Sequence, residues 1–571
     1  MLISAPEKKQ SQLESNEPKL TFSPPKYRSV FKVSSINFSF KSEEDKEAII
    51  DNFGKFLNSI NFPIQILCDS KIIDAKEWLL KIHDEEYYQF LKQTIQSRNI
   101  TEKTFYIAFT AQDNTELNML KNNIKNQIKR CNLICEETEV KEPQGIPELQ
   151  PTYVKIDGWY HSTFYVKNWP YSGYAGWLED LYNLDKNVSL AMFVHPVSKD
   201  QALPYIGRQL AKLSSSVMIK ESESNHDGLE DEDIITAVNM RDELNKNEGR
   251  FAFVSYYVTV KASSLQELKR DVKYVKTIMS GMMIETKKTT LRQDDGFRCT
   301  IPHGVDYLKN KAMYTFTTTP LKRFFPFISA NIVDRNGILI GENLLNNSLV
   351  FLDHFKYATA SMPIIGSSGS GKSYTIKAQI EKLKKQGIEV TALDIENEFV
   401  RMQQDKNFTV KHFGKTLNDD YKRFLFKYWD KVDNSPDVPR FLVIDEFWRY
   451  MKDLELAQLI QEMIKLSRKR WLGICPITQE VNDVLQSEYA ASIINNSSIK
   501  ILLKIEHNQR EIVKKTFGLT NSELSFLVGA SEGEGILFAG SNHVQFKTIT
   551  SPEQHKRITT KPQELYVHKV G

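Results

Sequence analysis

The second half of the chain is predicted to adopt an α/β fold around a mostly parallel sheet, and the first half an α+β fold. Two observations predict the α/β part. Short apolar runs of strand length alternate with stretches long enough for helices, at residues 390–395, 440–445, 473–478 and 499–505. A Gly/Ser-rich loop at 366–373 follows another apolar run, and Ile376, Ile380 and Leu383 come after it at helical spacing.

Composition describes an ordinary soluble protein. Of 571 residues, 41% are hydrophobic and 26% charged, and the net charge of +3 is too small to indicate nucleic-acid binding by itself. The five cysteines are sparse, which predicts a reducing compartment without a disulfide framework. We find no apolar run approaching about 18 residues and no apolar segment among the polar first thirty, so neither a transmembrane helix nor a secretory signal is expected.

Four segments are expected from composition. Residues 1–27, rich in charge and proline, are predicted to be a disordered arm. Residues 28–145 are predicted to be an α+β amino-terminal domain, followed by a proline-containing linker. A second α+β region is expected at 150–318 and the α/β domain at 319–571. No catalytic constellation is found before residue 319, because His195, His226 and His303 lack metal-ligand spacing.

The loop at 366–373, GSSGSGKS, fits the phosphate-binding pattern G-x-x-x-x-G-K-[ST]. Glycines let consecutive backbone N–H groups face a phosphate chain, and the helix that follows adds its positive dipole end. Lys372 is expected to reach the β- and γ-phosphates of ATP, and the Ser373 hydroxyl to hold Mg²⁺. The predicted nucleotide-binding residues are Gly366, Ser367, Ser368, Gly369, Ser370, Gly371, Lys372, Ser373 and Tyr374. The alternative is a flexible loop that matches by chance.

Two acidic residues, Asp445 and Glu446, stand at the end of the strand at 440–445, and Asp445 lies 73 residues after Lys372. Four apolar residues followed by two acids form a Walker B pattern. Asp445 is expected to hold Mg²⁺, and Glu446 to orient and deprotonate the attacking water. Hydrolysis needs the second acid, whereas nucleotide binding does not. The alternative is a solvated acidic turn.

For several other polar residues, more than one interpretation is open. Gln479 ends the next strand and could contact the γ-phosphate, or it could be a hydrogen-bonded loop amide. Asp394 and Glu398 could face the nucleotide or stabilise a helix N-terminus. The basic side chains at the end of an amphipathic helix and after the strand at 499–505 could be arginine fingers, DNA contacts or partners of a helix C-terminus. These finger candidates are Arg468, Arg470 and Arg510.

The ordered set of motifs resembles the VirB-type ATPases of type IV secretion and conjugative DNA transfer, a group related to the HerA–FtsK motors. The resemblance spans about residues 30–555. It is carried by residues 56–60, 62–65, 324–327, 337–341, 366–373, 393–399, 443–447, 468–469, 477–479, 518–524 and 533–535. One departure is that only 46 residues separate Glu398 from Asp445, where members of the family usually carry a helical insertion.

This resemblance implies a RecA-like core, a hexamer in at least one state, and a cytoplasmic protein associated peripherally with the inner membrane. Its implied partners are secretion-channel proteins, coupling ATPases and possibly DNA. The leading hypothesis is an ATP-hydrolysing motor that energises substrate transfer or pilus assembly. The alternatives are a soluble HerA–FtsK-like DNA translocase and a non-hydrolysing ATP-binding scaffold. The long amino-terminal half favours the first hypothesis, and Glu446 argues against the last.

Overall fold

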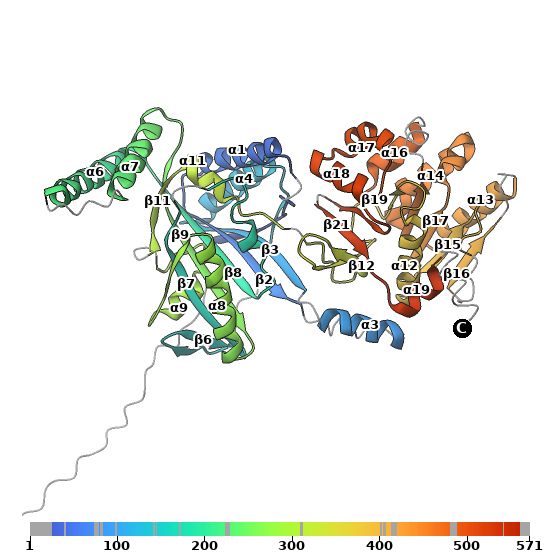
Figure 1. Ribbon diagram of the computed structural model, residues 1–571, viewed down its shortest axis with the longest axis horizontal. Coiled ribbons are helices and arrows are strands. Elements are labelled where there is room, and N and C mark those ends of the chain that lie inside the picture. The colour runs from blue at the N-terminus through green and yellow to red at the C-terminus, as the bar shows by residue number, and fades with distance from the viewer. Residues whose placement is uncertain are drawn as a thin grey trace, which may run out of the picture.

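The computed structural model describes residues 25–559 apart from 39–40, 74–78, 80–83, 97–99, 141–142, 144, 171–172, 223–228, 309–311, 330, 400–401, 403–406, 413–418, 480–487 and 541. The predicted arm at 1–27 therefore lies almost wholly outside the described residues. Figure 1 shows two bodies side by side, an amino-terminal one built on one sheet and a carboxy-terminal one built on another.

The amino-terminal body is a single antiparallel sheet of eleven strands with helices packed against it. Its main order is β4-β1-β3-β2-β8-β9-β7-β6-β5, with β10 on β7 and β11 on β9. The strands are β1 (Arg28–Val33), β2 (Ile64–Ile72), β3 (Thr101–Thr110), β4 (Cys135–Glu137), β5 (Glu148–Gln150), β6 (Tyr153–Ile156), β7 (Trp159–Asn168), β8 (Val188–Val197), β9 (Phe251–Ala262), β10 (Glu285–Lys288) and β11 (Tyr314–Thr317). The helices are α1 (Glu43–Ser59), α3 (Glu85–Gln96), α4 (Asn114–Arg130), α5 (Glu179–Tyr182), α6 (Lys199–Ser222), α7 (Leu229–Asn245), α8 (Leu265–Gly281), α9 (Gln293–Arg298), α11 (Thr318–Leu321) and the short η1 (Lys322–Phe324).

The expected boundary between residues 145 and 150 does not separate two sheets. Strand β2 pairs with β8 from Ile64↔Val194 to Ser70↔Val188, and this pairing joins the two predicted α+β regions into one continuous sheet. One hydrophobic core cluster contains buried residues of both regions, from Phe31 to Ile328. Hydrogen bonding between central strands and a shared core make the two regions one structural unit.

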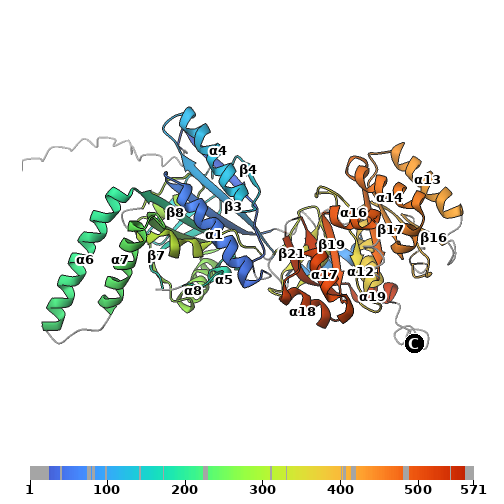
Figure 2. The ribbon, with the colours of Figure 1, turned by 90° about the horizontal axis from the view of Figure 1, so that it is seen from above.

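Two helical features of the amino-terminal body extend from its sheet. Helices α6 and α7 form a hairpin that projects away from the rest of the molecule (Figures 1 and 2). Helix α3 instead reaches the carboxy-terminal body, where Asp84 pairs with Lys385 at 2.8 Å and Glu86 with Arg557 at 3.0 Å. Leu91 of α3 lies in a small hydrophobic cluster with residues of the second sheet. Helix α3 is therefore the clearest contact between the two bodies.

The carboxy-terminal body has a ten-stranded sheet of order β13-β12-β21-β20-β19-β14-β18-β17-β15-β16. The strands are β12 (Ile338–Asn343), β13 (Leu349–Leu352), β14 (Ile364–Ile365), β15 (Glu389–Leu393), β16 (Phe408–Lys411), β17 (Arg440–Ile444), β18 (Leu472–Thr478), β19 (Ile499–Leu503), β20 (Glu534–Ala539) and β21 (Asn542–Thr548). The helices are α12 (Lys372–Lys385), α13 (Asp419–Asp433), α14 (Leu454–Leu466), α16 (Glu488–Asn496), α17 (Arg510–Phe517), α18 (Asn521–Gly529) and α19 (Pro552–Ile558), with short turns η3 (Phe447–Lys452), η4 (Ser467–Arg470) and η5 (His507–Gln509).

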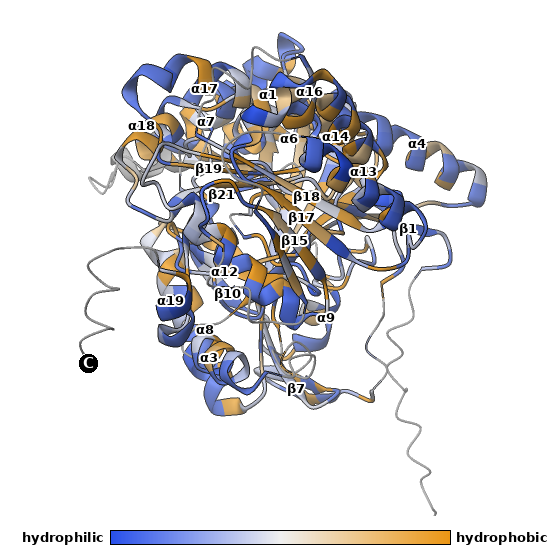
Figure 3. Cartoon of the chain, turned by 90° about the vertical axis from the view of Figure 1, so that its right-hand side faces the viewer, coloured by the Kyte–Doolittle hydropathy of each residue, from blue (hydrophilic) through white to orange (hydrophobic). Residues whose placement is uncertain are grey.

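Six strands from β19 to β16 are parallel, and the remaining strands add an antiparallel flank. Alternate residues of β17 lie in two different cores. Phe441 and Val443 pack in the cluster that contains α12, while Leu442 and Ile444 pack in the cluster of α13 and α14. Figure 3 shows β17 and β18 as hydrophobic and α13, at the surface, as largely hydrophilic. The predicted α/β fold with helices on both faces of a mostly parallel sheet is confirmed.

Candidate nucleotide site

The phosphate loop, the acidic motif and Gln479 meet at one edge of the second sheet. Strand β14 leads into the loop, and its last residue, Ile365, is in register with Thr478 of β18. Strand β17 runs parallel on the other side of β18, with Ile444 opposite Pro476. The residues that follow these three strands therefore emerge side by side, as expected for the carboxyl ends of parallel strands.

The phosphate loop has the backbone that its glycines predict. Gly369 and Gly371 have φ angles of 72° and 93°, in the left-handed region that glycine adopts without strain. A Cβ on Gly371 would lie only 2.7 Å from the backbone nitrogen of Gly533. The Gly533 N–H in turn donates to the Ser370 carbonyl at 3.0 Å. The turn around Gly533 therefore braces the loop from the β20 side, a contact that the sequence motif does not show.

Lys372 begins α12, and its ammonium turns back over the loop. Its Nζ donates to the carbonyl oxygens of Gly366 and Ser367, both at 2.9 Å. Burial lowers the pKa of Lys372, while the negative charges of Glu446, Asp445 and Glu398 partly offset that effect. The loop itself is open at its tip, where Ser368 and Gly369 are exposed. The lysine is thus held at the mouth of a loop that solvent can reach.

Asp445 is buried, with 6% of its surface exposed. Burial raises its pKa to about 7, and the neighbouring carboxylates of Glu398, Glu446 and Asp394 add to the effect. A carboxyl group whose charge is so poorly compensated by the protein favours a bound cation. Among the described residues, no group of three His, Cys, Asp or Glu side chains could form a metal site alone. Mg²⁺ binds through one or two protein oxygens together with water and phosphate, and the Asp445 carboxylate is a ligand of that kind.

Glu446 stands directly beyond the end of β17 in a strained backbone conformation, with φ 47° and ψ 48°. Left-handed geometry at a non-glycine residue costs about 1–3 kcal/mol and is frequent at functional sites. Its Oε1 accepts a hydrogen bond from Gln479 Nε2 at 2.8 Å. Its Oε2 accepts one from Trp448 Nε1 at 2.5 Å. Sequence reasoning placed Glu446 and Gln479 here but missed Trp448, although it lies only two residues from Glu446.

Asp394 and Glu398, the acidic residues that follow β15, have different roles in the structure. Asp394 is buried, and its carboxylate accepts the backbone N–H groups of Glu398 at 3.0 Å and Phe399 at 2.8 Å. It therefore caps the turn after β15, and the expected helix N-terminus is not found there, because residues 395–397 form bends. Glu398 lies 3.7 Å from the ammonium of the buried Lys377. Its charge also contributes to the raised pKa of Asp445.

Two predicted loop residues use their side chains within the protein. The Tyr374 hydroxyl is 2.7 Å from Thr550 Oγ1 and 2.8 Å from His555 Nδ1, and so links α12 to the segment around α19. The Ser367 hydroxyl donates to the Lys504 carbonyl at 3.1 Å. A role for either residue in nucleotide binding would therefore fall to its backbone or require these hydrogen bonds to break.

The three arginines predicted as fingers lie at opposite edges of the sheet. Arg468 and Arg470 are on η4, before the first residue of β18, so they lie at the amino ends of the parallel strands, and Arg470 pairs with Asp433. Arg510 follows the carboxyl end of β19, beside Gln509, whose side chain donates to the Gln479 carbonyl at 3.5 Å. Within the described parts of the chain, the Arg510 side chain has no ion-pair partner. Of the three, only Arg510 lies at the nucleotide edge.

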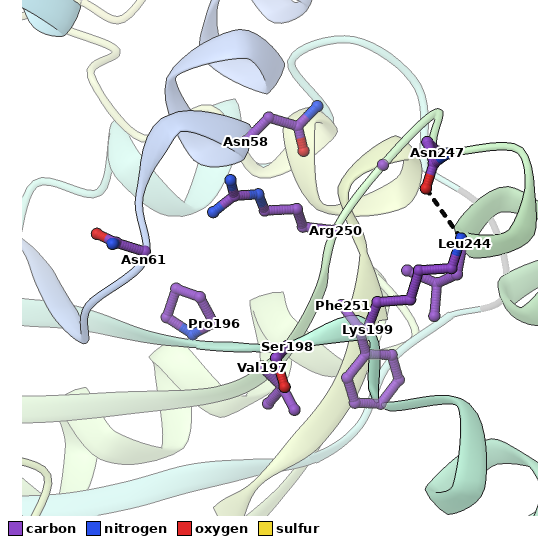
Figure 4. Close-up of a pocket in the computed structure, with 11 residues that line it drawn as sticks. Asn58, Asn61, Pro196, Val197, Ser198, Lys199, Leu244, Asn247, Arg250 and Phe251 are labelled. Atoms are coloured by element: carbon purple, nitrogen blue, oxygen red, sulfur yellow. Dashed lines mark hydrogen bonds between the residues drawn. The ribbon is translucent and has the colours of Figure 1, made fainter. Parts of the chain in front are cut away.

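A separate cavity of about 530 Å³ lies in the amino-terminal body, at the base of the α6–α7 hairpin (Figure 4). Its lining includes Lys199, Arg250 and the side-chain amides of Asn58, Asn61 and Asn247. Lys199 donates to Asn247 at 2.9 Å, and Arg250 donates to the Ile60 carbonyl at 3.0 Å. Because these cations already have protein acceptors and the cavity is far from the phosphate loop, it is not part of the nucleotide site.

The fold and the site together define a P-loop nucleotide-binding protein. Residues 425–536 match the model of the TraG P-loop domain, a span that includes Asp445, Glu446, Gln479 and Arg510 but begins after the phosphate loop. A stretch of 112 residues is 27% identical to the type IV secretion system protein CagE of Helicobacter pylori. That match covers 19% of this chain and only 11% of the length of CagE. The two matches confirm the predicted resemblance to type IV secretion proteins, each over about a fifth of the chain.

Solved structures similar to the chain include VirB4 of Thermoanaerobacter pseudethanolicus and the pCW3 conjugation coupling protein TcpA in complex with ATPγS. The VirB4 structure has 17% sequence identity and a TM-score of 0.35, over 39% of this chain and 99% of that chain. The corresponding values for TcpA are 16% and 0.29, over 43% of this chain and 73% of that chain. Among the described residues, no helix is both long and apolar enough to cross a bilayer.

Proposed function

We propose that this protein hydrolyses ATP to ADP and phosphate at the edge formed by β14, β18 and β17. The observation that carries the proposal is that Lys372 follows β14 and that Asp445 and Glu446 follow β17, two strands that run parallel to β18 on either side of it. Burial lowers the pKa of Lys372, and the negative charges of Glu446 and Asp445 oppose that effect. A cation, a metal-binding carboxylate and a second carboxylate are the groups that phosphoryl transfer to water requires.

Each residue has a defined task in this reaction. The backbone N–H groups of residues 366–373 and the positive end of α12 bind the phosphate chain. Lys372 exchanges the carbonyl oxygens of Gly366 and Ser367 for the β- and γ-phosphate oxygens. Ser373 and Asp445 would hold Mg²⁺, which when bound would neutralise charge on the phosphates. Glu446 orients the attacking water and accepts its proton.

The same site supports a role as the motor of a type IV secretion or conjugative transfer apparatus. The match of residues 425–536, which include Asp445 and Glu446, to the TraG P-loop domain and the similarity to CagE motivate this assignment. We infer that the protein acts as a hexamer docked to inner-membrane channel proteins and coupling ATPases on the cytoplasmic side. Arg510 then serves as the finger that reaches the γ-phosphate of a neighbouring subunit, because it lies at the nucleotide edge.

Hydrolysis is tested with Glu446→Gln against the matched control Glu455→Gln. Glu455 lies in the first turn of α14, and its ion-pair partner among the described residues is Lys422. We expect Glu446→Gln to lower kcat by about 100-fold or more, the usual contribution of a general base, with ATP still bound. Glu455→Gln should keep the wild-type rate. Equal rates in wild type and Glu446→Gln would contradict the assignment of the base.

The motor role has a separate test. The protein should fractionate with the membrane when the other transfer proteins are co-expressed and remain in the soluble fraction without them. Soluble behaviour in both cases, together with strong stimulation of hydrolysis by duplex DNA, would contradict the secretion assignment and favour a free DNA translocase.

A further inference from the structure

Glu446 is held by two hydrogen-bond donors, one on each carboxylate oxygen. Gln479, at the end of β18, donates to Oε1 at 2.8 Å, and Trp448, on η3, donates to Oε2 at 2.5 Å. Two donors that approach from different elements fix both the position and the rotation of a carboxylate. A hydrogen bond to an ionised acceptor is also about twice as strong as one between neutral groups.

The position of Trp448 follows from the backbone of the same turn. The left-handed conformation of Glu446 lets its side chain meet the indole N–H of the residue two positions later. The indole ring is itself fixed. It packs against the core cluster of α13 and α14, and the Lys452 ammonium and the Arg449 guanidinium lie 4.2 Å and 5.3 Å from its centre. Cations over an indole face are attracted to it, so the ring has little freedom to turn away.

The bond between Gln479 and Glu446 has a consequence for nucleotide sensing. Gln479 Nε2 carries two N–H groups, and one of them donates to Oε1, so the side chain can contact a γ-phosphate either with this hydrogen bond kept or with it broken. If that bond breaks, Trp448 remains as a donor to the carboxylate, on Oε2. Trp448 therefore holds the carboxylate in either case.

We propose that Trp448 is a positioning residue that holds Glu446 through its indole N–H, whether or not Gln479 turns from Glu446 to the γ-phosphate when ATP binds. The inference rests on the proposed function. A lone pair of Oε1 that Gln479 does not use takes the proton of the attacking water. The water oxygen bonds to the γ-phosphorus, the bond from that phosphorus to the β,γ-bridging oxygen breaks, ADP departs, and Glu446 returns the proton to solvent.

The kinetic test is Trp448→Phe, which keeps an aromatic ring and removes the N–H. We expect kcat to fall about ten-fold, the loss for one charge-assisted hydrogen bond, with KM for ATP unchanged. The matched control is Trp471→Phe, an exposed tryptophan of the same body at the opposite end of the strands, which should keep the wild-type kcat. A wild-type kcat in Trp448→Phe, or a rise in KM alone, would overturn the positioning role. Replacement of Trp448 by benzothienylalanine, which keeps the bicyclic ring without the N–H, should reproduce the loss if smaller ring volume is not its cause.

A spectroscopic readout tests the contact without any activity. The full-length protein is labelled with ¹⁵N-tryptophan, and the Trp448 indole resonance is the one missing from Trp448→Phe. Glu446→Ala should move that resonance strongly upfield, and binding of ATPγS with Mg²⁺ should leave it near its original position. An unmoved resonance in Glu446→Ala refutes the contact. If the contact is present but wild-type protein does not hydrolyse ATP, the proposed function fails instead, so the two failures are distinguishable.

Discussion

Each sheet carries or is followed by an aspartate with little exposure to solvent, and the surroundings of these two aspartates shift their pKa values in opposite directions. Asp69 of β2 lies 2.6 Å from Lys261 and 3.0 Å from Lys71, and Ser189 donates to it at 2.6 Å. Burial opposes the charge of Asp69, but these partners outweigh it and hold its pKa well below the usual range. Asp445, at the end of β17, has its pKa raised to about 7 by burial and by three nearby carboxylates.

The opposite pKa shifts distinguish a carboxylate with a structural role, Asp69, from one with a proposed functional role, Asp445. The amino-terminal sheet neutralises Asp69 with its own lysines, so nothing from outside is needed. In the carboxy-terminal body, burial and neighbouring carboxylates disfavour the negative charge of Asp445, which lies at the edge of the sheet where the phosphate loop is exposed. Perturbed carboxyl groups of this second kind gather at sites that bind cations or perform catalysis. The comparison therefore assigns stability to one body and chemistry to the other.

The largest expected effect is on activity. Asp445→Asn should lower the rate of ATP hydrolysis about 100-fold or more, because an amide is a poor ligand for Mg²⁺ at a site that stabilises transition-state charge. Asp69→Asn should leave the rate of the folded protein unchanged. Steady-state phosphate release measures both. If folded Asp69→Asn lost ATPase activity, the contrast between a structural Asp69 and a functional Asp445 would be contradicted.

The next effect is on stability. Asp69→Asn should destabilise the protein by about 2–3 kcal/mol, because it leaves Lys261 poorly solvated without its partner. Urea unfolding monitored by circular dichroism measures the loss. Asp51→Asn, which removes the exposed partner of Lys322, is the control and should cost less than about 1 kcal/mol. Equal losses in the two variants would mean that Asp69 is not a structural charge.

The pH dependence of stability should have opposite signs at the two sites. The pKa of Asp69 is lower in the folded state, so its contribution is present above the unfolded value of about 4 and is lost as the pH falls. The pKa of Asp445 is higher in the folded state, so its ionisation destabilises the Mg²⁺-free protein as the pH rises from about 4 to 7. In EDTA, Asp445→Asn should therefore be more stable than wild type by about 2 kcal/mol at pH 8, and the gain should vanish near pH 4. Thermal unfolding at several pH values checks both signs, and a destabilised Asp445→Asn at pH 8 would contradict them.

The smallest effect concerns the contact between the bodies. Arg557 pairs with Glu86 of α3 and with Glu381 of α12, so it links the amino-terminal body to the helix of the phosphate loop. Arg557→Ala should cost about 1 kcal/mol, since the network is partly exposed. Arg335→Ala, which removes a more exposed pair with Glu102, should cost less. Differential scanning calorimetry compares the two, and a larger cost for Arg335→Ala would show that α3 is not the principal contact.

Much of the site could be predicted because parallel strands end at one edge. Lys372, Asp445 and Gln479 each follow an apolar run, so their proximity needs only the rule that such runs pair in parallel. The same rule also predicts the position of Arg470, which precedes β18 and therefore lies at the opposite edge of the sheet. Trp448 could not be predicted, since its hydrogen bond depends on the left-handed backbone of Glu446.

The strand pairing of the amino-terminal body is harder to predict from the sequence. Residues 28–317 form one sheet because β2 pairs with β8, whose residues lie more than a hundred positions away. Alternation of apolar residues predicts strands but not which strands pair, so the sequence alone predicts a domain boundary at the proline-containing segment 139–151. Strands β5 and β6 in fact begin at its end and join the same sheet.

The most direct measurement compares ATP hydrolysis by two variants of one helix. Lys372 begins α12 at the phosphate loop, and Lys385 ends it beside Asp84 of the other body. Lys372→Ala should abolish Mg²⁺-dependent phosphate release, whereas Lys385→Ala should retain the wild-type rate. Hydrolysis at the wild-type rate by Lys372→Ala would show that the nucleotide is not processed at this edge of the sheet.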